Sequence, residues 1–367
     1  MKKEAKIFVA GHRGLVGSAI FKRLESKGYH NLVVRTRREL DLASQSEVEA
    51  FFEAEKPEYL FLAAARVGGI WANNAYPAEF IYQNLQIQAN VIHNAYVHGA
   101  PKLLFLGSSC IYPRECLQPM KEEYLLTNPL EPTNEAYAIA KIAGIKMCQF
   151  YHQQYGANFI SVMPTNLFGP GDNFDLATSH VLPALIRKFH LAKLATQGNW
   201  DEIKEDESRF GKIPQDIMAR LVAIAQSQGH PIPSSLKSQA PGIMTAAAII
   251  LWGTGRPRRE FLYVDDLADA CLFVMNHADA TWLCEEGISH LNIGTGSDIS
   301  ISELANMVKD IVGYEGEISY DPNKPDGMPE KMLDVTRLTS LGWNHRTSLH
   351  EGIQKSYAWY LEHSKAE

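Results

Sequence analysis

Short apolar runs alternate with helical spacing along the first 165 residues of the chain. The apolar runs lie at 6–10, 31–35, 59–65, 103–106 and 159–163, and each is short enough to be a buried strand. Between them, apolar residues recur every three or four positions at 18–27, 77–98 and 137–150, as in helices that pack on a sheet. This alternation predicts an α/β fold, with a Rossmann-type, doubly wound parallel sheet.

Beyond about residue 170 the alternation is less regular. Helical spacing returns at 181–189, 214–225, 264–276 and 302–312, with strands expected at 249–252 and 290–293 and a basic turn at 253–261. We therefore expect a Rossmann-type domain at 1–170, completed by helices from the C-terminal half. Residues 171–367 are expected to be mainly a smaller α/β lobe.

Composition and charge exclude several classes of protein. A net charge of −7 and a pI of about 6.0 lack the basic excess of a nucleic-acid-binding protein. The five cysteines are scattered without a Cys-x-x-Cys pair, so we expect a reduced, cytoplasmic protein without a metal site. The apolar run around 243–252 is too short to span a membrane, and the run at 7–10 is a strand rather than a signal peptide.

A glycine motif follows the first predicted strand. Gly11, Gly14 and Gly17 are spaced Gly-x-x-Gly-x-x-Gly and lie between a strand and a helix, as in dinucleotide-binding sites. Small residues let the backbone approach a pyrophosphate, and the helix N-terminus supplies N–H groups. The run Ala63–Ala65, which ends another strand, has no bulk and would let a cofactor lie across it.

The second predicted strand ends in a basic segment, Arg35-Thr36-Arg37-Arg38. Enzymes that use NAD usually carry an acid at this point, whereas a basic residue suits the 2′-phosphate of NADP. We therefore predict NADP(H), held by Arg13 and Arg37, with Asp41 and Leu42 near the adenine. The alternative is a solvated basic turn.

Tyr137 and Lys141 are four residues apart in a segment with helical spacing, so their side chains lie on one face. A nearby ammonium favours the phenolate, and we expect Lys141 to lower the pKa of Tyr137 towards neutrality. Ser108 and Cys110 follow a predicted strand, at the edge where doubly wound sheets bind ligands. These positions are suited to proton transfer.

Together these motifs resemble the extended short-chain dehydrogenase/reductases that act on nucleotide sugars. Matching segments include Gly11–Gly14, Ala65–Gly69, Ser108–Pro113, Tyr137–Lys141, Pro164–Pro170, His180–Leu185, Trp252–Gly255, Arg259–Phe261 and Lys324–Gly327. Within that family the set is similar to NADPH-dependent epimerase/reductases that convert GDP-4-keto-6-deoxy-D-mannose to GDP-L-fucose, by 3,5-epimerisation and then 4-keto reduction. The resemblance covers almost the whole chain except about 195–247.

The resemblance also implies individual roles. Ser108, Tyr137 and Lys141 match the reductase triad, and Cys110 and His180 match the acid/base pair for epimerisation. Residues expected to contact NADP(H) are Gly11, His12, Arg13, Gly14, Leu15, Val16, Gly17, Arg37, Asp41, Leu42, Ala64, Ala65, Lys141, Pro164, Thr165, Asn166, Leu167 and His180. Residues expected to hold the GDP-sugar are Lys188, Trp252, Arg259, Asp326 and Lys331.

Simpler interpretations exist for several features. Cys110 is otherwise a small buried residue, His180 a helix cap and Trp252 a core residue. We expect a homodimer through the helices at 77–98 and 137–150, although core helices show the same pattern. The inserted segment at 195–247 is interpreted as a surface extension rather than a substrate lid or a specificity change. Two other functions fit: an epimerase/reductase for another GDP-4-keto-sugar, of the colitose or deoxyheptose type, or a non-catalytic NADP(H)-binding regulator.

Overall fold

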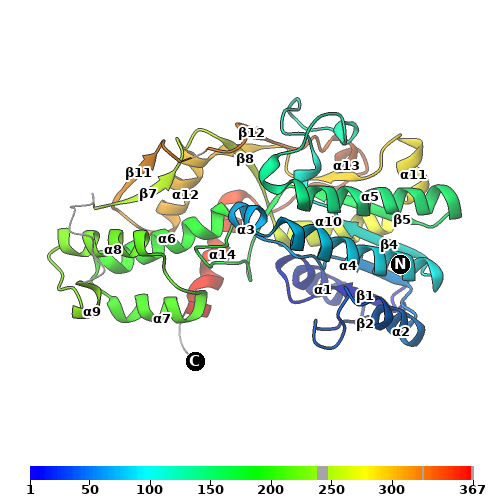
Figure 1. The fold of residues 1–367 in the computed structure, drawn as a ribbon, viewed down its shortest axis with the longest axis horizontal. Helices are drawn as coiled ribbons and strands as arrows, with labels where there is room; N and C mark the ends of the chain where they lie inside the picture. The colour runs from blue at the N-terminus through cyan, green and yellow to red at the C-terminus, as the bar shows by residue number, and fades with distance from the viewer. Residues whose placement is uncertain (238–246, 325, 365–367) are drawn as a thin grey trace. The chain divides into compact units, whose positions relative to one another are not determined.

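The computed structural model describes residues 1–237, 247–324 and 326–364 of the chain, so residues 238–246 of the inserted segment and Pro325 lie outside the described residues. The chain folds into two compact units, each built from segments distant in sequence (Figure 1). Unit 1 comprises Met1–Leu167, Glu260–Asp298 and Lys331–Thr347, and unit 2 comprises Phe168–Arg259, Ile299–Glu330 and Ser348–Glu367.

Unit 1 contains a six-stranded sheet in the order β2-β1-β3-β4-β5-β9, and all five strand pairs are parallel. The strands are β1 (Ile7–Ala10), β2 (Leu32–Val33), β3 (Tyr59–Leu62), β4 (Lys102–Leu106), β5 (Phe159–Pro164) and β9 (Leu291–Ile293). The strand order reverses between β1 and β3, which makes their carboxyl ends the expected ligand site. The predicted doubly wound parallel sheet is confirmed.

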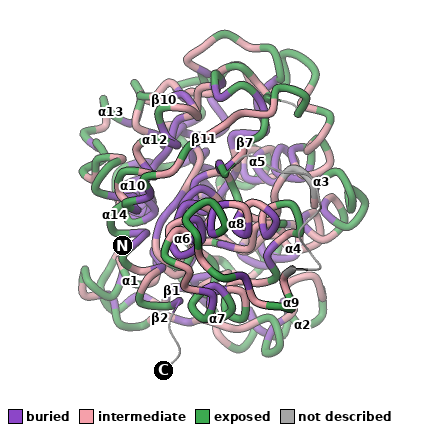
Figure 2. The backbone as a smooth tube through the Cα atoms, turned by 90° about the vertical axis from the view of Figure 1, so that its left-hand side faces the viewer, coloured by how far each residue is buried: buried purple, intermediate pink, exposed green. Residues whose placement is uncertain are grey.

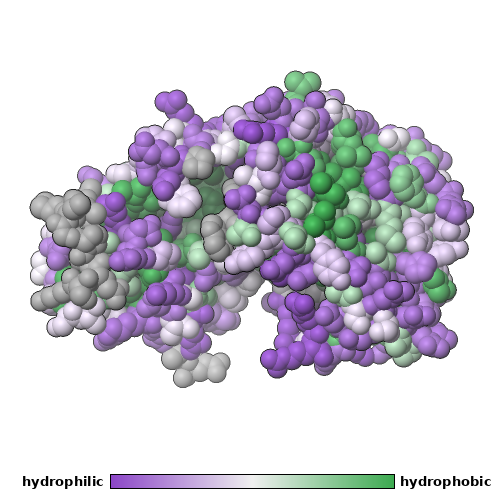
Figure 3. All heavy atoms as spheres, in the orientation of Figure 1, coloured by the Kyte–Doolittle hydropathy of each residue, from purple (hydrophilic) through white to green (hydrophobic). Residues whose placement is uncertain are grey.

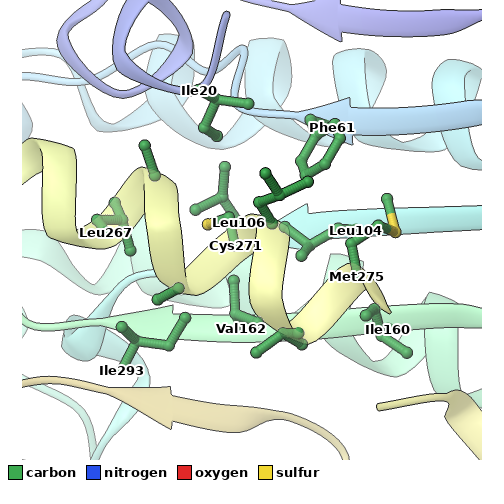
Figure 4. Close-up of a cluster of buried hydrophobic side chains, with 14 of the residues drawn as sticks. Ile20, Phe61, Leu104, Leu106, Ile160, Val162, Leu267, Cys271, Met275 and Ile293 are labelled. Carbon is green, nitrogen blue, oxygen red and sulfur yellow. The ribbon is translucent and has the colours of Figure 1, made fainter. Parts of the chain in front are cut away.

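Helices cover both faces of this sheet. The helices of unit 1 are α1 (Leu15–Ser26), α2 (Gln45–Glu55), α3 (Ile70–Ala75), α4 (Pro77–Val97), α5 (Glu135–Tyr155), α10 (Val264–His277), α11 (Ala280–Glu285) and α13 (Thr336–Ser340). Successive strand side chains point to opposite faces, so Leu104 and Leu106 pack with α1 and α10, and Leu103 and Phe105 pack with α2, α4 and α5. Figure 4 shows Leu267 of α10 in the cluster of buried side chains that contains Leu104 and Leu106.

Unit 2 is built around α6 (Val181–Thr196), most of which is buried (Figure 2). Its other helices are α7 (Trp200–Phe210), α8 (Gln215–Ser227), α9 (Ser234–Lys237), α12 (Ile301–Val312) and α14 (Leu349–Ser364). The strands β7 (Ala248–Trp252) and β11 (Glu317–Asp321) pair in parallel. Among the described residues, we find no helix with the length and apolar character needed to cross a membrane.

The chain passes between the units five times, and four of these crossings lie within short strands. These are β6 (Asn166–Phe168), β8 (Arg258–Tyr263), β10 (Asp298–Ser300) and β12 (Glu330–Lys331). The predicted basic turn at 253–261 is wrong from Arg258 onward, because β8 begins there. The consecutive apolar residues Phe261–Tyr263 form the second half of β8, and all three are buried, as in a strand within the core.

The inserted segment forms part of the core of unit 2, which corrects its interpretation as a surface extension. Arg187 of α6 is 0% exposed and pairs at 2.8 Å with Asp206 of α7, which is 1% exposed. The same guanidinium donates to the carbonyls of Phe174, Phe210 and Gly211 at 3.1, 2.8 and 2.6 Å. A buried guanidinium requires such partners, so α6 and α7 are fixed to each other by charge as well as by apolar contact.

Candidate functional site

The glycine loop requires residues without side chains. Gly11 has φ +88°, and a Cβ added to it would lie 2.8 Å from the Ala64 backbone nitrogen. A Cβ on Gly17 would lie 2.1 Å from the Gly11 carbonyl oxygen. Larger residues would separate α1 from the loop and from the end of β3. The structure thus places the glycine motif against Ala64, as the cofactor prediction requires.

The N-terminus of α1 is suited to bind an anion. Its N-cap, Gly14, supplies no side-chain cap, and no acidic residue lies in the first turn. The first N–H groups of a helix lack helical partners and carry partial positive charge, so they can bind a phosphate. Beside them, the buried Nδ1 of His12 has no hydrogen-bond partner in the protein. Burial and the charge of Arg13 lower the pKa of His12. These features fit a dinucleotide.

The basic segment after β2 divides into two kinds of arginine. Arg35 is turned back into the protein, where it pairs with Glu55 at 2.5 Å and donates to the Val34 carbonyl. Arg37 is directed outward, because its side chain is 74% exposed and lies 3.9 Å from Asp41. Arg13 of the glycine loop is also exposed. This geometry is compatible with Arg13 and Arg37 as phosphate contacts, whereas Arg35 has a structural partner.

Ser108, Cys110 and Tyr137 lie together at the carboxyl end of β4. A short 3-10 helix, Ser109–Ile111, begins directly after Ser108. The neighbouring Ser108 hydroxyl favours the ionised forms of the Tyr137 phenol and the Cys110 thiol and so acts to lower the pKa of each. Cys110 is 7% exposed, and burial raises its pKa while the nearby charge of Lys331 opposes that rise. The structure therefore brings Tyr137 of α5 to Ser108 and Cys110, the two residues that the sequence placed at this strand end.

Lys141 does not lower the pKa of Tyr137 in this structure, which corrects that prediction. Burial, followed by the charge of Cys110, raises the pKa of Tyr137, and the Ser108 hydrogen bond opposes the rise. The Lys141 ammonium donates to the Leu106 carbonyl at 2.7 Å and lies 5.8 Å from the centre of the Tyr137 ring. Burial lowers the pKa of Lys141 itself to about 8. Helical spacing gives the shared face but not the direction of the ammonium.

A close approach of α5 to the sheet brings Tyr137 and Lys141 to the carboxyl end of β4. A Cβ on Gly144 of α5 would lie 2.4 Å from Cζ of Phe105 in β4. Gln88 of α4 donates to the Ala140 carbonyl at 2.6 Å and fixes the two helices at this level. Because Gly144 lies one turn after Lys141, its missing side chain lets the Lys141 ammonium reach the end of β4.

Glu260 is an organising residue whose role the sequence did not reveal. Its side chain is 0% exposed and accepts hydrogen bonds from the N–H groups of Thr295, Gly296 and Leu333 at 2.5, 2.8 and 2.8 Å. Burial raises its pKa, and these N–H groups oppose the rise. Its carbonyl accepts from Asn166 at 2.8 Å. Glu260 thereby connects the predicted cofactor segment 164–167 to the strand that carries Lys331.

Unit 2 contains a cavity of about 260 Å³. Its lining residues are Lys188, Asp216, Ile217, Arg220, Ile249, Ile250, Trp252, Asp321 and Lys324. Trp252 is 64% exposed, so its alternative interpretation as a core residue is wrong, and the Lys324 ammonium lies 5.3 Å from its ring centre. Burial lowers the pKa of Lys188, and the charge of Asp216 opposes this. Lys188 and Trp252, which belong to the set predicted to hold the GDP-sugar, therefore line one cavity.

The other predicted residues of unit 2 occupy different positions. Asp326 accepts hydrogen bonds from the Thr254 N–H and hydroxyl at 2.6 and 2.8 Å. Burial lowers the pKa of Arg259, and the charge of Asp326 opposes this. His180 is the exposed N-cap residue of α6. Among the described residues that line the cavity, Arg259, Asp326 and His180 are absent. His180 belongs to unit 2, whereas Cys110 and the other predicted catalytic residues belong to unit 1.

Comparisons with known proteins agree with this geometry. The profile of the NAD dependent epimerase/dehydratase family matches residues 7–207 and 219–294. The chain is 51% identical over 360 residues to GDP-L-fucose synthase 1 of Arabidopsis thaliana, covering 98% of this chain and 94% of that protein. It is 48% identical over 359 residues to GDP-L-fucose synthase of Escherichia coli, covering 97% of each.

A solved structure extends the comparison to the fold. The GDP-mannoheptose C4 reductase of Campylobacter jejuni, solved with NADP bound, is 40% identical to this chain with a TM-score of 0.80. The alignment covers 98% of this chain and 99% of that one. The chain belongs to the NAD dependent epimerase/dehydratase family and, within it, to the NADP-dependent epimerase/reductases that include the GDP-L-fucose synthases.

Proposed function

We propose that this enzyme converts GDP-4-keto-6-deoxy-D-mannose to GDP-L-fucose by 3,5-epimerisation and NADPH-dependent reduction, as a cytoplasmic homodimer. The observation that carries the proposal is the group formed by Ser108, Cys110 and Tyr137 at the carboxyl end of β4. The choice of substrate is supported by sequence identities of 51% and 48% to two GDP-L-fucose synthases.

The first step uses the acidity that a 4-keto group gives to its neighbours. Removal of a proton from C3 or C5 leaves an enolate whose charge is delocalised onto the same oxygen, O4. The hydroxyls of Ser108 and Tyr137 are proposed to donate to O4. In a site shielded from water, each fixed donor of this kind stabilises the developing charge by about 3–4 kcal/mol. One oxyanion site therefore serves both inversions.

Cys110 and His180 are proposed to exchange the protons at C3 and C5. Thiols and imidazoles in water ordinarily titrate near enough to neutral pH to act as acid or base, and burial raises the pKa of the Cys110 thiol from that range. The positive charge of Lys331 favours the thiolate of Cys110 against the effect of burial. His180 enters the proposal through its sequence motif, His180–Leu185, and its exposed position before α6.

The reduction is proposed to use the same donors. Bound NADPH supplies hydride to C4. Tyr137 then gives its proton to the O4 alkoxide, and its raised pKa keeps that proton in place until the alkoxide forms. Lys141 is proposed to orient the nicotinamide ribose. The remaining cofactor contacts are proposed to come from residues 11–17, Arg37, Asp41, Leu42, Ala64, Ala65, 164–167 and His180.

The GDP-sugar is proposed to bind through Lys188, Trp252, Arg259, Asp326 and Lys331. Lys188 and Trp252 line the cavity of unit 2, where the exposed indole offers a flat surface for a base. Cationic side chains suit a diphosphate, because each can form charge-assisted hydrogen bonds with its oxygens.

An apolar surface on unit 1 supports the proposed homodimer. Figure 3 shows hydrophobic side chains gathered over α4 and α5. Val97 on α4 and Ile139 and Phe150 on α5 are 56%, 42% and 57% exposed. Exposed apolar patches of this kind mark interaction sites, and the α4 and α5 helices of two protomers would bury this surface in a four-helix interface.

One assay separates the candidate functions. The protein is incubated with GDP-4-keto-6-deoxy-D-mannose and NADPH while nicotinamide absorbance is followed and the sugar product is identified. Loss of absorbance with GDP-L-fucose as product is expected. Turnover only of a GDP-4-keto-heptose would favour the second candidate, which the C. jejuni structure at 40% identity supports. Cofactor binding without turnover of any keto-sugar would favour a regulator.

A further inference from the structure

Helix α8 of the inserted segment forms part of the wall of the cavity in unit 2. It contributes Asp216, Ile217 and Arg220, and the other lining residues come from α6, β7, the end of β11 and the segment that follows it. Asp216 and Arg220 are four residues apart, so both side chains lie on one face of α8. The profile of the family does not match residues 208–218, which include the start of this helix.

The opposite face of α8 is anchored in the core. Met218, Leu221 and Val222 are 6%, 0% and 2% exposed. The buried pair between Arg187 and Asp206 fixes the preceding helix of the insert to α6, beside Lys188. A helix held in this way presents its polar residues at defined positions, as a binding wall requires.

The lining combines charges with an exposed aromatic ring. Three cations, Lys188, Arg220 and Lys324, face two carboxylates, Asp216 and Asp321, so the formal charge of the wall is positive by one. An anion with an aromatic part suits such a cavity, because the base can stack on Trp252 while the phosphates meet the cations. Of the common ligands, a nucleoside diphosphate has both parts.

We propose that Arg220 binds the diphosphate of the nucleotide, so that the insert supplies a specificity-determining residue of the nucleotide site. This proposal rests on the proposed function and deepens it, since it assigns a ligand group to a residue outside the predicted substrate set. Arg220 provides a planar fork of donors that matches two phosphate oxygens, and α8 holds it on the same cavity as Lys188. Asp216 in turn favours the charged form of Lys188.

The test is a calorimetric titration of the full chain with GDP and with guanosine, without the sugar substrate. In Arg220→Gln, GDP is expected to bind about 10-fold to 100-fold more weakly, the loss typical of one hydrogen bond to a charged group. Guanosine affinity should stay unchanged because guanosine has no phosphate. Arg220→Lys should lose less GDP affinity than Arg220→Gln, since the positive charge remains. Arg209→Gln, a change at an exposed arginine of α7, serves as the matched control.

Two results would overturn the inference. One is GDP binding by Arg220→Gln that equals binding by Arg209→Gln. The other is an equal loss of GDP and guanosine affinity, which would show that the side chain acts on the base or on the shape of the cavity. Failure of the proposed function is recognised separately: the unmodified enzyme would then bind GDP through Arg220 and yet leave GDP-4-keto-6-deoxy-D-mannose unchanged in the presence of NADPH.

Discussion

Replacing Arg187 by methionine removes the charge that joins α6 to α7 while keeping much of the side-chain volume. The guanidinium is fully buried and makes four hydrogen bonds, one to Asp206 and three to backbone carbonyls. Among the residues that the structure describes, Asp206, which is 1% exposed, would keep only the Tyr360 hydroxyl as a hydrogen-bond partner for its carboxylate. The change therefore leaves a buried charge without its counter-charge.

The expected loss in free energy of unfolding is about 3–5 kcal/mol. That is the typical cost of removing one partner from a buried ion pair, because the remaining charge is neither solvated nor neutralised. The three carbonyls left without a donor act in the same direction. Since domains are stable by only about 5–15 kcal/mol, the variant should unfold at clearly lower denaturant concentration.

Urea unfolding followed by circular dichroism measures this loss, and NADPH binding reports separately on unit 1. We expect the transition of unit 2 to move to lower urea, with NADPH affinity unchanged, because Arg187 and all its partners lie in unit 2. Arg209→Met, at an exposed position of α7, should change stability by less than about 0.5 kcal/mol.

The double variant Arg187→Met with Asp206→Leu gives the decisive comparison. With both charges removed, the uncompensated carboxylate is gone, and the double variant should be more stable than Arg187→Met alone. A loss below about 1 kcal/mol in Arg187→Met would refute the reasoning, because a surface ion pair contributes that much. So would a double variant whose loss equals the sum of the two single losses.

Four further predictions concern the site in unit 1. Tyr137→Phe should lower kcat for reduction by about 10²–10⁴-fold and leave NADPH affinity nearly unchanged, and reduction at the normal rate would exclude proton donation by Tyr137. Cys110→Ser should slow solvent deuterium uptake at C3 or C5, measured by mass spectrometry without NADPH; unchanged exchange would remove Cys110 from the mechanism. Arg37→Gln should weaken NADPH binding by about 10-fold to 100-fold and spare NADH, so an equal loss for both cofactors would contradict a contact to the 2′-phosphate. Because burial lowers the pKa of Lys141 to about 8, its charge is present below that pH and lost above it, and kcat/KM for NADPH should fall as the pH rises through about 8. A profile that stays flat to pH 10 would contradict this assignment.

The repeat of strands and helices could be read from the chain because each element carries its own periodicity. The apolar runs at 59–65 and 103–106 correspond to β3 and β4, and the helix expected at 77–98 corresponds to α4 (Pro77–Val97). Local spacing also placed Tyr137 and Lys141 on one helix face. It could not give the direction of the Lys141 ammonium, because that depends on the Leu106 carbonyl and on how closely Gly144 lets α5 approach β4.

The sequence by itself determined the sheet, the glycine loop and the positions of Ser108 and Cys110 at one strand end, because short-range patterns and motif spacing encode these features. Tertiary structure alone decided that the inserted segment is core, that Arg220 and Trp252 share a cavity, and that burial raises the pKa of Tyr137. Each of these depends on contacts between residues far apart in the chain. Burial, electrostatic environment and cavity lining arise only when those residues meet.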